Sequence, residues 1–229
     1  MKYFLITLLS VAFLFSVCHA DEKLDLKDQK DKESYSLGYQ FGQNLKTQGV
    51  DINLDVYTSG IRDALDGKDS LISQEEIRAV ISELQKRVMA ARQKEVKEKS
   101  EKNLAEGKAF LDENKKREGV KTLPSGLQYK VLVEGSGKTP KATDTVIVHY
   151  RGTLINGSEF DSSYKKGQPS TFQVNGVIRG WSEALQLMKV GSKWQLFIPS
   201  ELAYGERAVG GQIPPNSTLI FEVELISVK

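Results

Sequence analysis

The positions of the prolines constrain the fold of this chain more than any other feature. All six prolines lie at or beyond Pro124, and none precedes it. Proline removes a backbone hydrogen-bond donor and clashes with the preceding helical turn, so a segment without proline can form uninterrupted helices. Beyond about residue 120, apolar and polar residues alternate instead. The sequence therefore predicts a helical first part followed by a domain of different construction.

The first helical segment, residues 34–45, carries a pattern of small residues. Ser34, Gly38 and Gly42 recur every four residues and would share one face of a helix. Glycine inside a helix costs about 1 kcal/mol relative to alanine, so two glycines at this spacing indicate that another backbone approaches closely. The pattern leaves open whether that backbone belongs to the same chain. Residues 21–33 are mostly charged and are expected to form a mobile lead-in.

Two more helices are predicted before the prolines begin. Residues 54–65 have apolar side chains every three or four positions, and Gly67 follows at the usual place beyond a helix end. Ser73 and Glu76 form a capping-box pattern that opens a third helix, which we expect to run over residues 74–116. A helix of that length spans about 60 Å. Its polar middle indicates a solvated spacer, with a disordered charged linker as the alternative.

Residues 1–20 have the composition of a cleavable signal peptide. Lys2 precedes an apolar run that ends at Val17, and small residues lie at positions suited to cleavage after Ala20. The apolar run is short for a membrane span. An alternative is acylation of Cys18, although Val17 is larger than the residue normally found before a lipidated cysteine. The sequence predicts export to the periplasm and leaves outer-membrane or cell-surface association open.

The composition excludes several classes of chemistry. Cleavage after Ala20 would leave no cysteine and a single histidine, His149, which we interpret as a packing residue. Disulfides, thiol catalysis and histidine-rich metal sites are therefore not expected, and neither is any cofactor. The chain has 32 basic and 30 acidic residues, a net charge of +2, so no strong field favours nucleic acid.

The second part has the pattern of an antiparallel sheet. Four segments alternate apolar and polar residues and are predicted to be strands, namely 128–133, 145–150, 192–198 and 218–228. Asn156-Gly157 is a strong hairpin signal, and the only helical pattern covers residues 181–189. These elements predict an α+β fold with one short helix across an antiparallel sheet. We divide the chain into a signal peptide, an N-terminal helical region, a connecting helix and a C-terminal domain, at residues 1–20, 21–72, 73–118 and 119–229.

Three separated motifs in the second part carry a family resemblance. They are VHYRGTLINGSEFDSS (148–163), VIRGWSEALQLMKV (177–190) and AYGERAVGGQIPP (203–215). In this order they closely resemble an FKBP-type peptidyl-prolyl isomerase. The resemblance implies a twisted antiparallel sheet wrapped on a short helix, with the prolyl ring of the substrate bound between them. We therefore expect activity to reside in residues from about Val120 onward.

The resemblance also assigns residues to the site. The residues implied to act on the substrate are Tyr150, Asp161, Tyr204 and Phe221. Those implied to form the walls and floor of the prolyl pocket are Phe160, Phe172, Val177, Ile178 and Trp181. The main-chain N–H of Ile178 and the hydroxyl of Tyr204 are expected to donate to substrate carbonyls. Two positions leave the substrate preference open. Family members often carry an aromatic residue at the position of Ser170, and they differ from one another at the loop tip, Val209-Gly210.

The reaction needs no nucleophile. The barrier to rotation about an X-Pro bond is about 18–20 kcal/mol because amide resonance must be broken. An apolar pocket favours the twisted amide, and each factor of ten in rate requires only about 1.4 kcal/mol of differential binding. Substrates would be proline-containing unfolded polypeptides, and macrolide inhibitors are expected to bind.

The order of segments resembles the macrophage infectivity potentiator (Mip) group of bacterial isomerases. This resemblance implies that the face of Ser34, Gly38 and Gly42 belongs to a homodimer, in which two catalytic domains would hold one client with chaperone activity. The alternative is a holdase or surface interaction module that binds peptide without turnover.

Overall fold

The structure is a computed structural model, and it describes residues 25–229. The signal-peptide and lipidation hypotheses concern residues that lie outside this range. The chain divides into two compact units, one ending at Leu71 and one running from Ile72 to Lys229. Among the described residues, no helix is both long enough and apolar enough to cross a membrane.

The first unit consists of two helices, α1 (Gln29–Thr47) and α2 (Leu54–Leu65). Helix α1 begins earlier than expected, because residues 29–33 form its first turn instead of a mobile lead-in. The side chain of Asp28 caps this end by accepting a hydrogen bond from the backbone N–H of Asp31 at 2.8 Å. A good cap and an intrahelical bond from Gln29 to Glu33 at 2.9 Å offset the charge of this segment. The charged composition of residues 21–33 alone therefore did not predict where α1 begins.

Neither helix of the first unit contains a buried residue. The aromatic rings of Phe41 and Tyr57 stack at 5.3 Å, yet large apolar side chains of both helices remain exposed. These exposed side chains are Tyr35, Leu37, Tyr39, Phe41, Leu54, Val56, Ile61 and Leu65. A Cβ added at Gly38 or at Gly42 would meet no atom within 4 Å. Within residues 25–229, the two glycines therefore have no close neighbour outside their own helix.

The second unit starts with the long helix α3 (Gln74–Asn114). Ser73 caps it as expected, by accepting a hydrogen bond from the backbone N–H of Glu76 at 3.1 Å. Along its exposed part, α3 carries ion pairs between lysines and glutamates four residues apart, such as Lys94 with Glu98. The helix is continuous, so the disordered-linker alternative is wrong.

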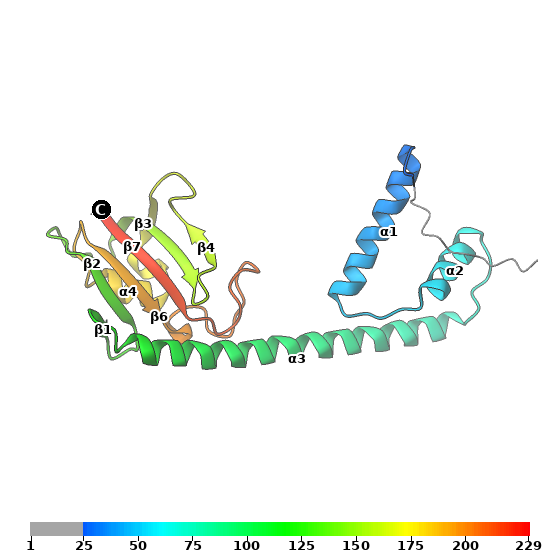
Figure 1. Ribbon diagram of the computed structural model, residues 1–229, viewed down its shortest axis with the longest axis horizontal. Coiled ribbons are helices and arrows are strands. Elements are labelled where there is room, and N and C mark those ends of the chain that lie inside the picture. Colours follow the sequence, from blue (N-terminus) through cyan, green and yellow to red (C-terminus); the bar gives the residue numbers. More distant parts are fainter. Residues whose placement is uncertain (1–24) are drawn as a thin grey trace, which may run out of the picture. The chain divides into compact units, whose positions relative to one another are not determined.

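A sheet of seven strands follows, and all its pairings are antiparallel (Figure 1). Its main path runs in the order β1-β2-β6-β7-β3-β4, and β5 also pairs with β3. The strands are β1 (Val120–Thr122), β2 (Gln128–Val133), β3 (Thr145–Leu154), β4 (Glu159–Ser162), β5 (Ser170–Gln173), β6 (Lys193–Ile198) and β7 (Leu219–Val228). One α-helix, α4 (Arg179–Leu185), packs on this sheet through its buried side chains. The predicted α+β fold class is confirmed.

Three strands were not predicted, and the short helix was placed too far along the chain. Strands β1, β4 and β5 have only three or four residues each, too few to show an alternating pattern. Helix α4 was expected over residues 181–189, but it begins at Arg179 and ends at Leu185. The hairpin signal was correct, because Gly157 lies between β3 and β4 with a φ of 84°.

The core lies between α4 and one face of the sheet. Alternate residues of β7 point into it, and they are Leu219, Phe221, Val223 and Leu225. Trp181 and Leu185 of α4 are buried against this face. Burial of this apolar surface supplies most of the free energy of folding of the domain.

The last turns of α3 cover the opposite face of the sheet. The ring of Phe110 lies 6.0 Å from that of Phe197 on β6. Gln128 of β2 donates from its side-chain amide to the carbonyl oxygen of Leu111 at 2.9 Å and accepts from the buried Asn114 at 2.9 Å. A fragment beginning at Val120 would lose these contacts and expose Phe197. The expectation that activity resides in residues from about Val120 onward stays a prediction, and a fragment that keeps these contacts would begin within α3.

Gly107 allows this close approach, and its replacement gives a sharp test. A Cβ at Gly107 would overlap the hydroxyl of Thr218 and lie 3.2 Å from Thr218 Cβ. Thr218 is buried and branched at Cβ, so the clash cannot be relieved by a flexible side chain. We expect Gly107→Ala to lower the free energy of unfolding by about 1–3 kcal/mol through overpacking, although glycine to alanine normally stabilises a helix by about 1 kcal/mol.

Urea denaturation followed by tryptophan fluorescence measures this effect, since Trp181 and Trp194 both lie in the second unit. The matched control is Gly60→Ala in α2, where an added Cβ meets nothing within 4 Å. The control should leave the tryptophan transition unchanged. A Gly107→Ala protein as stable as the control would contradict the close packing of α3 on the sheet.

Candidate active site

A pocket of about 840 Å³ opens between α4 and the sheet. This volume lies within the range of small-molecule binding sites. All nine residues that the sequence assigned to the site line it: Tyr150, Phe160, Asp161, Phe172, Val177, Ile178, Trp181, Tyr204 and Phe221. They come from β3, β4, β5, α4, β7 and the loops beside them. Residues more than 70 positions apart in the sequence thus meet around one cavity.

Trp181 lies at the centre of the aromatic cluster. Its ring meets those of Tyr150, Phe172 and Phe221 edge to face, at centroid distances of 5.3, 5.7 and 5.2 Å. Edge-to-face pairs each contribute about 0.5–1.5 kcal/mol beyond the area that they bury, so the rings hold one another in place. The result is a rigid apolar floor suited to a small ring.

Gly152 of β3 makes room for two of these rings. A Cβ at this position would lie 2.7 Å from atoms of both Phe160 and Phe221, whose rings pack edge to face at 5.5 Å. The rings of Phe160 and Phe221 lie so close to the backbone of β3 that only glycine fits at position 152.

One wall of the pocket is formed by the segment between the 3₁₀ turn Ser200–Leu202 and β7, residues 203–218, which we name the rim loop. It contributes Tyr204, which the sequence assigned, and several residues that it did not assign to the pocket walls. The unassigned residues of the rim loop are Ala203, Arg207, Val209, Gly210, Gln212 and Ile213. Their loop positions show no periodicity, so periodicity could not identify them as lining, and the only sequence signal was that they fall within the motif at residues 203–215.

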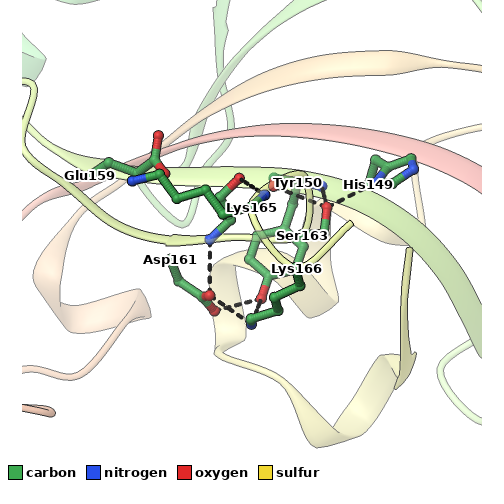
Figure 2. Close-up of polar contacts among 8 residues, drawn as sticks. His149, Tyr150, Glu159, Asp161, Ser163, Lys165 and Lys166 are labelled. Carbon is green, nitrogen blue, oxygen red and sulfur yellow. Dashed lines mark hydrogen bonds and ion pairs between the residues drawn. The ribbon is translucent and has the colours of Figure 1, made fainter. Parts of the chain in front are cut away.

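A polar group closes one edge of the pocket (Figure 2). The Tyr150 hydroxyl donates to the Asp161 carboxylate at 2.5 Å, and the ammonium group of Lys166 contacts the same carboxylate at 2.7 Å. Lys166 also donates to the Tyr150 hydroxyl oxygen at 3.1 Å. The backbone N–H of Ser162 completes the set at 2.9 Å. These bonds fix the ring of Tyr150 and the carboxylate of Asp161 relative to the aromatic floor.

The charges of this group hold the carboxylate ionised. Partial burial alone would raise the pKa of Asp161, but the hydrogen bonds from Lys166 and Tyr150, with the charge of Lys166, outweigh burial and lower it below its ordinary value. Burial and the bond to Asp161 raise the pKa of Tyr150. The bond to Asp161 likewise raises the pKa of Lys166. Sequence reasoning missed Lys166, whose only signal was its position five residues beyond Asp161 in a turn.

His149 lies outside the pocket, as its interpretation as a packing residue predicts. Its ring stacks on that of Tyr164 at a centroid distance of 4.6 Å. Its Nδ1 lies 3.0 Å from the hydroxyl oxygen of Ser163, as Figure 2 shows. Ser163 in turn accepts from the backbone N–H of Tyr150 at 2.8 Å. Within residues 25–229, no cluster of three or more histidine, cysteine, aspartate or glutamate side chains could hold a metal ion.

These pKa directions predict a flat pH profile. A lowered pKa at Asp161 and a raised pKa at Tyr150 leave no change of charge in the polar group between about pH 5 and pH 9. The contribution of the ionised carboxylate to stability is present above its ordinary pKa and is lost only as the pH falls through its lowered value, below about pH 4. We expect kcat/KM on a short X-Pro peptide to vary less than about twofold from pH 5 to pH 9. A bell-shaped profile within that range would contradict the assignment.

The fold and the pocket define a domain with an aromatic cavity, suited to a small apolar ring, between a short helix and an antiparallel sheet. Two family models match the chain, one described as FKBP-type peptidyl-prolyl cis-trans isomerase over residues 136–226 and one as the domain amino-terminal to it over residues 30–131. "Outer membrane protein MIP" of Legionella longbeachae is 51% identical over 210 residues, covering 92% of this chain and 90% of that protein. The FKBP-type 22 kDa peptidyl-prolyl cis-trans isomerase of Escherichia coli is 48% identical, covering 85% and 93%.

Solved structures agree with these relatives. The crystal structure of FkpA from Escherichia coli matches with a TM-score of 0.74 and 42% identity, over 90% of this chain and 99% of that one. The chain belongs to the FKBP-type peptidyl-prolyl cis-trans isomerase family, and it is a peptidyl-prolyl isomerase. Its relatives along nearly the full length are of the Mip and FkpA type, which confirms the resemblance found in the sequence.

Proposed function

We propose that this protein is a dimeric folding catalyst with chaperone activity that rotates X-Pro bonds in exported proteins, and that the pocket around Trp181 is its catalytic site. The observation that carries this assignment is the convergence of all nine assigned side chains on one cavity of about 840 Å³. Its floor of interlocked aromatic rings is complementary to a prolyl ring, and its polar edge lies where the adjoining peptide group would pass.

The chemistry follows from the difference between the planar and the twisted amide. In the twisted state, the carbonyl loses its resonance with the nitrogen and becomes less polar. Transfer from water to an apolar pocket therefore costs this state less than it costs the planar amide, and the barrier falls. Every 1.4 kcal/mol of this difference accelerates the reaction about tenfold. No proton transfer or covalent bond is required.

Hydrogen-bond donors at the pocket edge would orient the substrate. The main-chain N–H of Ile178, just before α4, donates to no acceptor within the described part of the chain, and neither does the hydroxyl of Tyr204. Both residues line the pocket, so both donors are available to substrate carbonyls. Asp161 orients Tyr150 through their hydrogen bond, and its carboxylate would place a fixed negative charge at the edge of the pocket along which the substrate amide passes.

The exposed apolar surface of the first unit supports a homodimer. Among residues 25–229, nothing buries the large apolar side chains of α1 and α2, and the face of Gly38 and Gly42 is open. Soluble proteins seldom leave such a surface uncovered. A second copy of the same unit would bury it, and the dimer would present two pockets to one client, which raises avidity.

Export is supported by the predicted signal peptide and by the name "Outer membrane protein MIP" of the Legionella longbeachae relative. Periplasmic clients would be unfolded, proline-containing chains. Macrolides are expected to compete for the same pocket, because a large apolar ring system fits its aromatic floor.

Refolding of a protein client limited by proline isomerisation tests the proposal against a non-catalytic holdase. A catalyst shortens the slow refolding phase at substoichiometric concentration, and a saturating macrolide abolishes this effect. A holdase lowers aggregation but leaves the slow phase at its uncatalysed rate, which would contradict the proposed folding function.

A further inference from the structure

The rim loop, which forms one wall of the pocket, is attached at its base to helix α3. The side-chain amide of Asn103 donates to the carbonyl oxygen of Pro215 at 2.8 Å, and that of Asn216 donates to the hydroxyl oxygen of Ser100 at 2.8 Å. Both bonds join residues more than 100 positions apart in the sequence, and both are partly buried. Hydrogen bonds shielded from water are stronger than exposed ones, so these two hold the loop base in a defined position.

The residues of α3 that touch the loop share one face of the helix. Ser100, Asn103 and Gly107 are separated by three and four positions, which places them in line along α3. Gly107 brings the helix backbone against Thr218, where the rim loop enters β7. The loop base therefore runs beside two turns of α3 (Figure 1).

Asn216 connects this contact to the pocket. It is the only residue other than glycine with a positive φ in residues 25–229, at 54°. Its backbone N–H donates to the carbonyl oxygen of Gly205 at 2.7 Å, while its side chain binds Ser100. Gly205 directly follows Tyr204, a lining residue. Two hydrogen bonds thus lead from α3 to the position of Tyr204.

A left-handed backbone conformation at asparagine is uncommon and persists where the surroundings hold it. The hydrogen bonds that join Asn216 to Ser100 and to Gly205 hold it in this conformation. Without the bond to Ser100, the side chain of Asn216 would have no partner on α3. The loop base would then be held to α3 only by the bond from Asn103 to Pro215 and by the packing of Thr218 on Gly107.

We propose that Ser100 and Asn103 of helix α3 are positioning residues for the isomerase pocket. Ser100 acts through Asn216, and Asn103 acts through the neighbouring Pro215, both at the base of the rim loop. This inference rests on the proposed assignment of the pocket as the catalytic site. The loop conformation that completes the pocket wall is populated fully only while α3 is docked. When these hydrogen bonds to α3 are absent, only a fraction of the molecules have the loop conformation that binds substrate. The apparent affinity for substrate is reduced in proportion to that fraction.

The coupling must act in both directions. If docked α3 favours the loop conformation that binds substrate, then bound substrate favours docked α3 to the same extent. Ligand in the pocket should therefore slow amide hydrogen exchange in α3 around residues 100–107, although no residue of α3 lines the pocket. A purely structural role of these side chains gives no such dependence on the ligand.

The test uses the full chain with the double substitution Ser100→Ala and Asn103→Ala. We expect KM for a short X-Pro peptide to rise about threefold to tenfold, the range that corresponds to one or two lost hydrogen bonds, with kcat changed less than about twofold. The peptide should slow exchange of the amides of residues 100–107 in the wild type but not in the double variant. The matched control is Ser82→Ala with Gln93→Ala, two exposed positions of the same helix.

The control should behave as the wild type in both measurements. Native tryptophan fluorescence of the double variant establishes that the sheet domain is folded. If the double variant matches the control in KM and in ligand-dependent exchange while the wild type is active, the positioning role is overturned and the pocket assignment stands. If the wild type itself shows no turnover, both the pocket assignment and the positioning role are overturned.

Discussion

Replacing Asp161 with leucine is expected to lower kcat/KM on a short X-Pro peptide by about tenfold to a hundredfold, which equals about 1.4–2.8 kcal/mol in the activation barrier. The substitution removes the acceptor of the Tyr150 hydroxyl and the ion-pair partner of Lys166. Tyr150 then loses its fixed orientation at the pocket edge. The cation of Lys166 is left without its ion-pair partner, next to the pocket in which the amide becomes less polar as it twists. Catalytic loss should therefore exceed any loss of stability.

A neighbouring carboxylate provides the control. Glu159 forms ion pairs with Arg151 at 2.7 Å and with Lys165 at 2.9 Å, and it does not line the pocket. Glu159→Gln should leave kcat/KM within about twofold of the wild type, and Tyr150→Phe should have a milder effect than Asp161→Leu. Peptide turnover and circular dichroism measure the two consequences separately. An Asp161→Leu protein with native dichroism and full activity would show that the polar edge takes no part in catalysis.

Replacing Gly38 and Gly42 together with leucine is expected to convert a dimer into a monomer. Both positions share one face of α1, and no described residue lies close to that face at either glycine. Leucines there would hold a second backbone away, and overpacking costs about 1–3 kcal/mol per site. Light scattering measures the mass directly. Turnover of a short peptide should survive, because the pocket lies wholly in the second unit.

Catalysed refolding of a large client by this variant should slow, because two pockets no longer act on one chain. The control is Gln40→Leu with Asn44→Leu, which adds the same two leucines at the same spacing on the opposite face of α1. This control should remain dimeric. A glycine double variant that stays dimeric, or a wild type that is monomeric at micromolar concentration, would contradict a dimer interface at Gly38 and Gly42.

The sequence predicted those helices and strands that are long enough to show a regular alternation or spacing of apolar residues. Strand β2 has the predicted bounds, and β7 shows the expected alternation of buried Leu219, Phe221, Val223 and Leu225. Motifs, rather than periodicity, identified the pocket residues, because side chains from separate strands and loops carry no common spacing. The assigned side chains do meet in one cavity, and their catalytic roles stay predictions.

The packing of α3 on the sheet could not be predicted, because, apart from Phe110, the residues that make it are mostly small or polar. Ser100, Asn103, Gly107 and Asn114 give no apolar stripe, and their helix segment looked solvated. Their partners are main-chain carbonyls and polar side chains far away in the sequence, such as Pro215 and Gln128. Lys166 was missed for a similar reason, since a lysine in a turn resembles any exposed lysine until its carboxylate partner is located.

Exchange NMR on a short peptide with a single Leu-Pro bond tests the central claim most directly. The cis and trans forms give separate signals, and uncatalysed exchange takes tens to hundreds of seconds at 25 °C. Catalytic amounts of the full-length protein should produce exchange cross-peaks on the sub-second timescale, and a macrolide that fills the pocket should remove them. The absence of cross-peaks with the wild type, or their persistence when the pocket is occupied, would contradict the assignment of prolyl isomerisation to the pocket around Trp181.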